Sequence, residues 1–246
     1  MKVIDPAKFI DEFAVVAEAR GFVVQPLMVT DAGPLIGCVR DGVGETHYLS
    51  AGIHGDEPAG PLAARALLDE GFFEDGRRWV VCPALNPTGL AQGTRENATG
   101  CDLNRDYLRL GCAETQVHVK WLETQPAPIQ FFSLHEDWES HGFYFYEINL
   151  GTDMPQRARQ ILQAVEPWFE PEPSSQIDDH EVRAPGWIYH SAEADFPDHW
   201  PEAIYMAKRG CARSFTYETP SSMALEDRVA AHVAAVQAGM PGAGGG

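Results

Sequence analysis

The feature that most constrains the fold is a repeated order of apolar segment, polar turn and amphipathic segment. The apolar run 47–53 leads into the turn Gly52-Ile53-His54-Gly55-Asp56-Glu57. Residues 58–68 follow, rich in Ala and Leu, with prolines only in the first turn, where a missing N–H costs little. This order predicts a strand, a turn and a helix. Further strands are predicted at 79–85, 129–134, 143–148 and 214–217, and further helices at 114–122, 155–168 and 226–237.

Strands that alternate with helices, with polar residues at the strand ends, predict an α/β fold. We expect a mixed, mostly parallel twisted sheet with helices on both faces. At the N-terminus, Asp5-Pro6 opens an amphipathic helix that Gly21 stops, and strands at 22–29, 35–40 and 47–53 predict an antiparallel start to the sheet. Asp153 is the expected opening residue of the 155–168 helix.

Two segments do not fit regular structure. Residues 170–201 are rich in Pro and acidic residues, and we expect them to form a long loop that lines the entrance to a site. The Gly-rich tail 241–246 is expected to be disordered, which leaves residues 1–240 as one domain.

Charge excludes some partners. The chain has 36 acidic and 18 basic residues and a formal net charge of -18, so a nucleic acid or an anionic membrane surface would be repelled. The first residues include Asp5, Lys8, Asp11 and Glu12, which argues against a signal peptide or a membrane span there.

The five cysteines are scattered and contain no CxxC pair. This pattern argues against a disulfide framework and against a thiolate zinc site, and it predicts a reducing, cytoplasmic location. The cysteines are Cys38, Cys82, Cys101, Cys112 and Cys211.

His54 and Glu57 have the spacing of two ligands for one zinc ion. Hydrolytic zinc sites commonly use two His and one Glu and leave a fourth position for water. His135 is the preferred third ligand because it ends the strand 129–134, and site residues of open sheets gather at strand ends. His141 is a rival ligand. The remaining histidines lack a neighbouring pattern that indicates a site: His47, His118, His180, His190, His199 and His232.

The loop from Thr94 to Arg105 concentrates guanidinium, amide and carboxylate groups. Taken with the HxxE pair and the strand-end His, this loop resembles the zinc carboxypeptidases, whose members share an HxxE pair, a later Arg, a DLNR-like string, a strand-end His and a late Glu. The resemblance runs from about residue 47 to residue 220 and implies a zinc carboxypeptidase-like catalytic domain over residues 1–240 with one Zn²⁺ per chain.

The resemblance also implies a role for each matched residue. His54, Glu57 and His135 match the zinc ligands, and Asp102 matches the carboxylate that orients the first zinc histidine. Arg95 matches the arginine that polarises the scissile carbonyl, and Glu218 matches the general base. Asn104 and Arg105 match the pair that holds the substrate's terminal carboxylate. The tyrosine that closes over substrate in digestive members has no clear counterpart, with Tyr189 and Tyr205 as candidates.

These roles predict a zinc-dependent amide hydrolase. Its substrate would be a short peptide or peptide-like compound, a cell-wall fragment for example, with a free carboxylate beside the scissile amide. One alternative is an N-acyl amino-acid deacylase that resembles succinylglutamate desuccinylase and aspartoacylase. Another is a noncatalytic binding protein that keeps the metal but not the turnover. Glu136, Asp137 and Glu139 are expected in a solvated turn, and the aromatic strip 143–146 in core packing.

Overall fold

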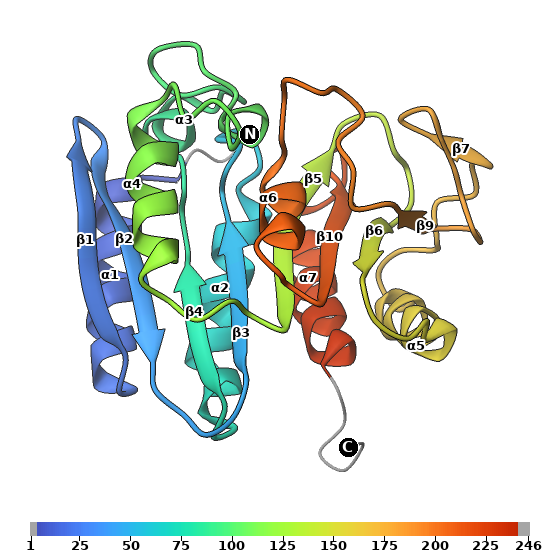
Figure 1. The fold of residues 1–246 in the computed structure, drawn as a ribbon, viewed down its shortest axis with the longest axis horizontal. Helices are drawn as coiled ribbons and strands as arrows, with labels where there is room; N and C mark the ends of the chain where they lie inside the picture. Colours follow the sequence, from blue (N-terminus) through green and yellow to red (C-terminus); the bar gives the residue numbers. More distant parts are fainter. Residues whose placement is uncertain (1–3, 241–246) are drawn as a thin grey trace.

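The computed structural model describes residues 4–240, whose centre is one eight-stranded sheet (Figure 1). The strand order is β1-β2-β4-β3-β5-β10-β6-β9. The strands are β1 (Val23–Thr30), β2 (Gly33–Arg40), β3 (Thr46–Ala51), β4 (Arg78–Cys82), β5 (Gln130–Asp137), β6 (Tyr144–Asn149), β9 (Trp187–His190) and β10 (Arg213–Pro220). The tail prediction at 241–246 lies outside the described residues.

The sheet is mixed, as predicted, with parallel pairing at its centre. Strands β4, β3, β5 and β10 run parallel to one another, and β6 pairs with β10 in the antiparallel direction. Strands β1, β2 and β4 form the antiparallel start. The predicted place of β3 in that start is wrong, because β4 lies between β2 and β3. Parallel pairing of β3 with β4 requires a crossover, and the helix after β3 supplies it.

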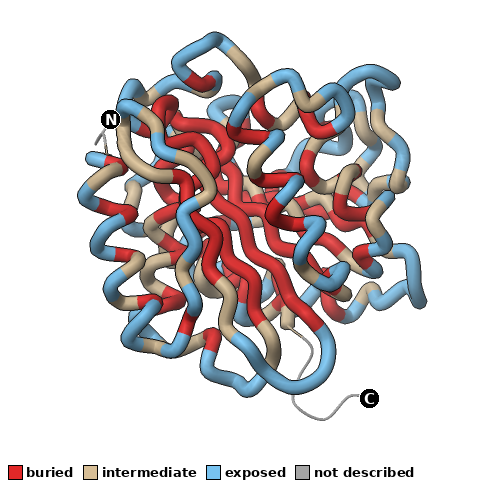
Figure 2. The backbone as a smooth tube through the Cα atoms, turned by 60° about the vertical axis from the view of Figure 1, so that its left-hand side comes forward, coloured by how far each residue is buried: buried red, intermediate tan, exposed pale blue. Residues whose placement is uncertain are grey.

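Four helices cover one face of the sheet: α1 (Pro6–Ala19), α2 (Ala59–Asp69), α5 (Pro155–Val165) and α7 (Leu225–Gly239). Their apolar residues, such as Ile10, Leu67 and Ile161, form one core with Phe132 and Phe215 of the sheet. The central strands are buried along their length (Figure 2). This core is larger than the core on the other face of the sheet, and it stabilises the fold by burying apolar surface.

The other face of the sheet carries α4 (Ala113–Glu123) and α6 (Glu202–Lys208). Side chains alternate between faces along a strand, so residues paired in the ladder share a face. Through the ladder, His135 of β5 shares this face with Glu218 of β10 and Tyr144 of β6. These three polar residues therefore lie on the side of the sheet opposite the larger core.

Several short elements were not predicted from the sequence: α3 (Pro87–Gln92), α6, the 3-10 turns Phe72–Glu74 and Leu103–Arg105, and the small hairpin of β7 (Gln176–Ile177) and β8 (His180–Glu181). Residues 170–201 are thus irregular only in part, since β9 joins the main sheet. Helix α5 begins as predicted, but its N-cap is Met154 rather than Asp153. None of the helices at 4–240 combines the length and apolar character needed to cross a bilayer.

Candidate metal centre

Three strands bring the predicted site residues together. The turn after β3 carries His54 and Glu57, and β5 carries His135 near its end. Gly55 allows this turn to pack tightly, because a Cβ at that position would lie 1.9 Å from the carbonyl carbon of Gly89. The order of strands in the sheet places β3 beside β5 and β5 beside β10. The three donors therefore come from neighbouring strand ends, although His135 is 81 residues from His54.

The donor atoms of the three side chains converge. His54 Nδ1 lies 2.6 Å from Glu57 Oε1, and His135 Nδ1 lies 3.0 Å from Glu57 Oε2. The two Nδ1 atoms are 3.3 Å apart. All three residues are buried, with at most 5% of their surface exposed. This is a compact set of two imidazoles and one carboxylate.

The cluster fits a metal ion. Glu57 Oε2 is buried, yet no residue of the described chain donates a hydrogen bond to it. His135 Nδ1 lies 3.0 Å from this oxygen but does not form a hydrogen bond with it. A buried carboxylate oxygen without a donor costs free energy, which a bound cation would offset. Each outward ring nitrogen lies near an oxygen that could orient a metal-binding imidazole, although only that of His135 forms a hydrogen bond in this structure. His54 Nε2 lies 3.4 Å from Asp102 Oδ1, and His135 Nε2 lies 3.0 Å from Ser133 Oγ.

The electrostatics favour a cation as well. Burial alone would raise the pKa of Glu57, but the adjacent His54 and His135 lower it well below its usual range. The pKa of Asp102 is also held low, because contacts with His54 and the nearby Arg95 and Arg105 outweigh its burial. Both carboxylates are therefore ionised at neutral pH, and the site offers negative charge to a metal ion.

Arg95 lies at the edge of the donor cluster. Its Nε donates to Asp102 Oδ2 over 3.0 Å, and its Nη1 lies 3.3 Å from His54 Nδ1 and 3.9 Å from Glu57 Oε1. The guanidinium is thus fixed by a carboxylate while one of its nitrogens faces the donors. A positive group held in this way can stabilise negative charge that develops on a substrate oxygen.

Glu218 is the strand neighbour of His135 in the β5–β10 ladder, and its side chain is half-buried on the same face of the sheet. Burial raises the pKa of Glu218 well above its usual range, and repulsion from Glu57, Asp137 and Asp178 adds to the effect. A carboxyl group in this position can accept and return a proton. Glu218 is thus the neighbour of the donor residue His135 on the adjacent strand.

Asn104 and Arg105 lie in the 3-10 turn Leu103–Arg105, close to Asp102 in the chain. The side-chain oxygen of Asn104 accepts a hydrogen bond of 2.9 Å from the backbone N–H of Glu202, so it caps α6. Only the amide nitrogen of Asn104 is left to donate to a ligand. Arg105 is half-buried and donates to the backbone oxygen of Asn104. Its guanidinium keeps further donors for a carboxylate.

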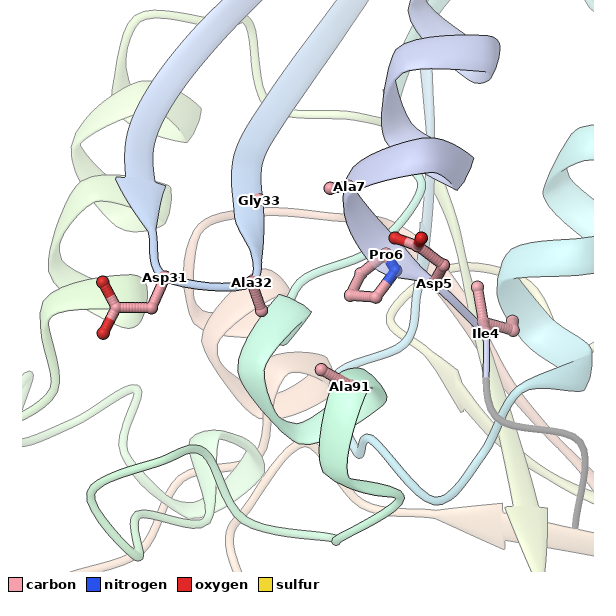
Figure 3. A pocket seen from close by; sticks show the side chains of 8 residues that line it. All are labelled: Ile4, Asp5, Pro6, Ala7, Asp31, Ala32, Gly33 and Ala91. Carbon is pink, nitrogen blue, oxygen red and sulfur yellow. The ribbon is translucent and has the colours of Figure 1, made fainter.

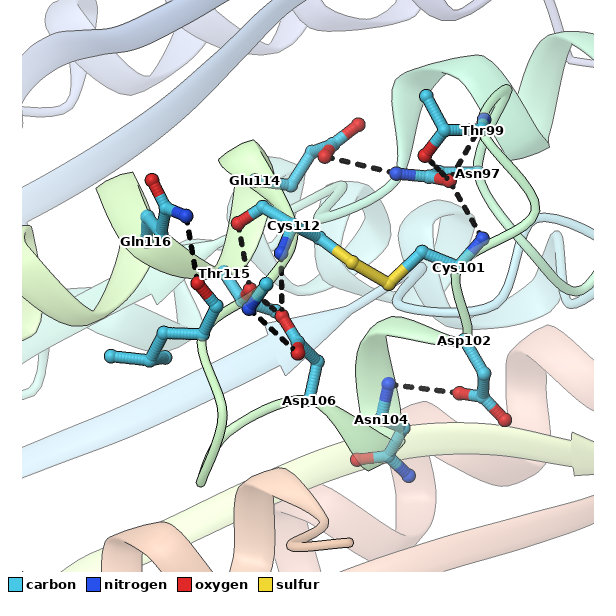
Figure 4. Close-up of a disulfide and its surroundings, with 12 residues drawn as sticks. Asn97, Thr99, Cys101, Asp102, Asn104, Asp106, Cys112, Glu114, Thr115 and Gln116 are labelled. Atoms are coloured by element: carbon cyan, nitrogen blue, oxygen red, sulfur yellow. Dashed lines mark hydrogen bonds between the residues drawn. A yellow bond between two sulfur atoms is a disulfide. The ribbon is translucent and has the colours of Figure 1, made fainter.

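A disulfide closes the loop that carries these residues (Figure 4). Cys101 and Cys112 are bonded, so the prediction of no disulfide is wrong for this pair. Asp106 folds the loop back by accepting from the backbone N–H groups of Gly111 and Cys112, which brings the two Cα atoms to 6.7 Å. The other three cysteines are free and buried. The cysteines therefore do not support the predicted reducing compartment.

Some neighbours of the site were not predicted from the sequence. Tyr144 is paired with Glu218 in the β6–β10 ladder and donates to Asp137 over 3.1 Å, so only the odd members of the 143–146 strip pack in the larger core. Because side chains alternate between the two faces along a strand, the sequence could have indicated that Tyr144 and Tyr146 face away from Phe143 and Phe145. The predicted solvated turn is wrong for Glu136, which is buried and accepts from Ala59 N and Arg228.

Other candidates lie away from the donors. His141 is exposed and outside the His54–Glu57–His135 group. Tyr189 is half-exposed on β9, where Arg183 lies over its ring, and Tyr205 packs against Tyr107. Neither tyrosine forms a hydrogen bond or a ring contact with His54, Glu57 or His135.

A separate hollow of about 430 Å³ lies where the start of α1 meets the β1–β2 turn and α3 (Figure 3). Its lining is mostly small and apolar, including Pro6, Ala32 and Ala91, and Asp31 points away from the other side chains. Asp5 is already used, since it caps α1 by accepting from Lys8 N. Among residues 4–240, the lining of this hollow includes no histidine, cysteine or serine, and it shares no residue with the His54–Glu57–His135 group.

Sequence comparisons agree with the geometry. Residues 43–123 match the succinylglutamate desuccinylase/aspartoacylase catalytic domain. A region of 99 residues is 33% identical to the protein named "Probable carboxypeptidase 2" of Arthroderma benhamiae and 32% identical to carboxypeptidase 2 of Trichophyton tonsurans. Each match covers 36% of this chain but only 18% of the relative, so the chain spans a small part of the length of these carboxypeptidases.

Solved structures confirm the fold. A protein from Shewanella amazonensis assigned as a metallopeptidase superimposes with a TM-score of 0.81 at 24% identity, over 94% of this chain and 91% of the other. A succinylglutamate desuccinylase from Silicibacter gives a TM-score of 0.57 at 18% identity, over 88% of this chain and 64% of the other. The resemblance to metallocarboxypeptidases and to this deacylase family, expected from the motifs, is confirmed.

Proposed function

We propose that this chain, which is metallocarboxypeptidase-like in its fold and in part of its sequence, is a zinc-dependent amide hydrolase. The observation that carries the proposal is the convergence of His54, Glu57 and His135, with Glu218 beside His135 in the sheet. Two neutral imidazoles and one carboxylate are a common protein donor set for catalytic zinc. When bound, zinc would supply Lewis acidity toward a carbonyl and make a coordinated water more acidic.

The chain's own residues would handle charge and protons. Glu218 accepts the proton of the attacking water at a carboxylate oxygen and returns it to the leaving amine. Arg95 stabilises the negative oxygen of the tetrahedral species, an effect that is typically worth about 3 kcal/mol per donor. Asp102 holds both Arg95 and the outer nitrogen of His54 in position. These roles use each residue in the geometry described above.

Arg105 and the amide nitrogen of Asn104 would bind a substrate carboxylate. A guanidinium grips a carboxylate with two parallel hydrogen bonds, which lysine cannot reproduce. The proposed substrate is therefore a short peptide or peptide-like compound with a free carboxylate beside the scissile amide. The matched segment 43–123 supports a second candidate, hydrolysis of N-acyl amino acids, which carry the same carboxylate.

A panel of dipeptides and N-acyl amino acids separates these two candidates. The peptidase proposal expects release of free amino acids from dipeptides, with amidated dipeptides as poor substrates because they lack the carboxylate. Hydrolysis of the acyl amino acids alone would contradict the peptidase proposal and favour the deacylase.

A Glu218→Gln variant tests whether the protein is an enzyme rather than a metal-containing binding protein. The variant should retain zinc and lose about 10²- to 10⁴-fold in kcat, because Gln cannot accept the proton. Glu139→Gln is the matched control, since Glu139 is exposed in the turn after β5. Equal kcat values in the two variants would refute the role of Glu218.

A further inference from the structure

A second group of metal-binding side chains lies outside the site described above. It consists of His180 on β8, His190 at the end of β9 and Asp195 in the loop that follows. His180 Nε2 lies 3.5 Å from Asp195 Oδ2, and His190 Nε2 lies 3.4 Å from Asp195 Oδ1. The two imidazole rings have centroids 4.7 Å apart. The proposed hydrolysis uses none of these residues.

The orientation of His190 favours a ligand at its Nε2. The Nδ1 of His190 contacts the backbone oxygen of Ser191, and a carbonyl oxygen can only accept. The Nδ1 must therefore carry the proton, which leaves a lone pair on Nε2 in the neutral ring. That lone pair faces the Asp195 carboxylate, so the two groups repel each other unless a proton or a cation lies between them. A carbonyl partner of this kind commonly fixes the tautomer of metal-binding histidines.

The distances suit a transition metal. Tetrahedral coordination with bonds of about 2.0–2.1 Å separates the donor atoms by about 3.3 Å. The observed separations of 3.4 and 3.5 Å between imidazole nitrogen and carboxylate oxygen are close to that value. Two imidazoles and a carboxylate suit Zn²⁺ and Co²⁺ better than the oxygen-preferring Mg²⁺ or Ca²⁺. His190 is mostly covered and Asp195 is half-exposed at its side chain, so an ion could enter from solvent.

The surroundings of the group link it to the polar face of the sheet. His190 shares a face with Tyr146 and Tyr144, because β6 and β9 pair in parallel with Ile148 beside His190. The Tyr146 ring packs edge-on against both histidines, and its hydroxyl donates to Asp178 over 2.7 Å. Asp178 is also one of the groups that raise the pKa of Glu218. The strand registers therefore place His190 on the side of the sheet that carries Glu218. The β7–β8 hairpin lies near β9 at this edge of the sheet (Figure 1).

We propose that His180, His190 and Asp195 bind a second divalent transition metal, of the zinc and cobalt class, which ties the β7–β8 hairpin and the loop after β9 to the sheet edge. The proposal is separate from the proposed hydrolysis and needs no catalytic role for this ion. It predicts that metal binding orders the segment from Asp178 to Asp195.

Metal titration of the full chain tests the site. The protein is stripped with a chelator and titrated with Zn²⁺, and bound metal is counted by elemental analysis after gel filtration. The His180→Ala/His190→Ala double variant should bind one equivalent less than the unmodified chain. The matched control, His199→Ala, alters an exposed histidine in the same loop and should keep the full count. His135→Ala should lose a different equivalent, so the comparison stands whether or not the proposed catalytic site binds zinc.

Equal zinc counts in the unmodified chain, the double variant and His199→Ala would overturn the proposal. Circular dichroism of the double variant checks its fold.

A second measurement, limited proteolysis, can be made on the unmodified chain. Trypsin can cleave after Arg183, an exposed residue between the two histidines. Zinc at ten times its Kd should slow this cleavage about tenfold, because binding reduces the population of the opened segment. In the double variant the rate should not respond to zinc. Cleavage of the unmodified chain at the same rate with and without zinc would also overturn the proposal.

Discussion

The free energy of unfolding should depend on pH because Glu202 carries a buried carboxyl group. Its side chain is fully buried at the start of α6, where Tyr48 and Ser50 each donate to it over 2.7 Å. Burial nevertheless raises the pKa of Glu202 from 4.5 to about 7, more than these hydrogen bonds lower it. The group is therefore protonated in the folded protein over a pH range in which it ionises in the unfolded chain.

The sign and size of the effect follow from linkage. Because the folded pKa lies above the unfolded one, the stabilising contribution is complete below about pH 4.5 and is lost as the pH rises through about 7. A difference of about 2.5 in pKa corresponds to about 3 kcal/mol in total, and about 2.5 kcal/mol of this falls between about pH 5 and about pH 8. Glu202→Gln cannot titrate, so it should remove this part of the pH dependence.

Urea unfolding at about pH 5 and about pH 8 measures the effect. The stability difference between Glu202→Gln and the unmodified chain should shift by about 2.5 kcal/mol in favour of the variant at the higher pH. Glu45→Gln, in an exposed turn, is the control and should shift by less than about 0.5 kcal/mol. A constant difference for Glu202→Gln across the range would refute the argument from burial.

Three further changes test the loop between β4 and α4. In steady-state kinetics, Arg105→Lys should raise KM about tenfold or more for substrates with a free carboxylate, but not for amidated substrates. The control variant Arg109→Lys alters an exposed arginine and should leave KM unchanged. Asp102→Asn should weaken zinc binding by about 10- to 100-fold in a competition titration, and unchanged affinity would argue against its contact with His54. Replacing both Cys101 and Cys112 with Ser should lower the free energy of unfolding by about 3 kcal/mol, because the disulfide closes a loop with a sequence separation of 11. An unchanged midpoint of urea unfolding would contradict this prediction.

The individual helices and strands could be predicted because the periodicity of apolar residues and the turn residues are local features of each segment. The helix after Glu57 and the strand before His135 are examples, and both agree with the structure. Strand order could not be predicted in the same way. The short turn between β2 and β3 suggested a hairpin, but β3 gains more by pairing on both sides with β4 and β5 in the buried centre.

The site could be anticipated where its residues form a motif and not where the fold alone assembles them. His54 and Glu57 are three positions apart, so their proximity is local. Cys101 and Cys112 meet only because Asp106 turns the loop back on itself. His180 and His190 are ten positions apart without a motif between them, and they meet because the β7–β8 hairpin brings the His180 ring against that of His190 on β9. Tertiary proximity of this kind has no local pattern in the sequence.

The most direct test of the account is to locate the metal. Crystals of the full chain loaded with zinc, measured above and below the zinc absorption edge, show where each ion lies. We predict an anomalous peak about 2.0–2.2 Å from His54 Nδ1, from His135 Nδ1 and from a carboxylate oxygen of Glu57. Zinc-loaded crystals without a peak among these three residues would contradict the central claim.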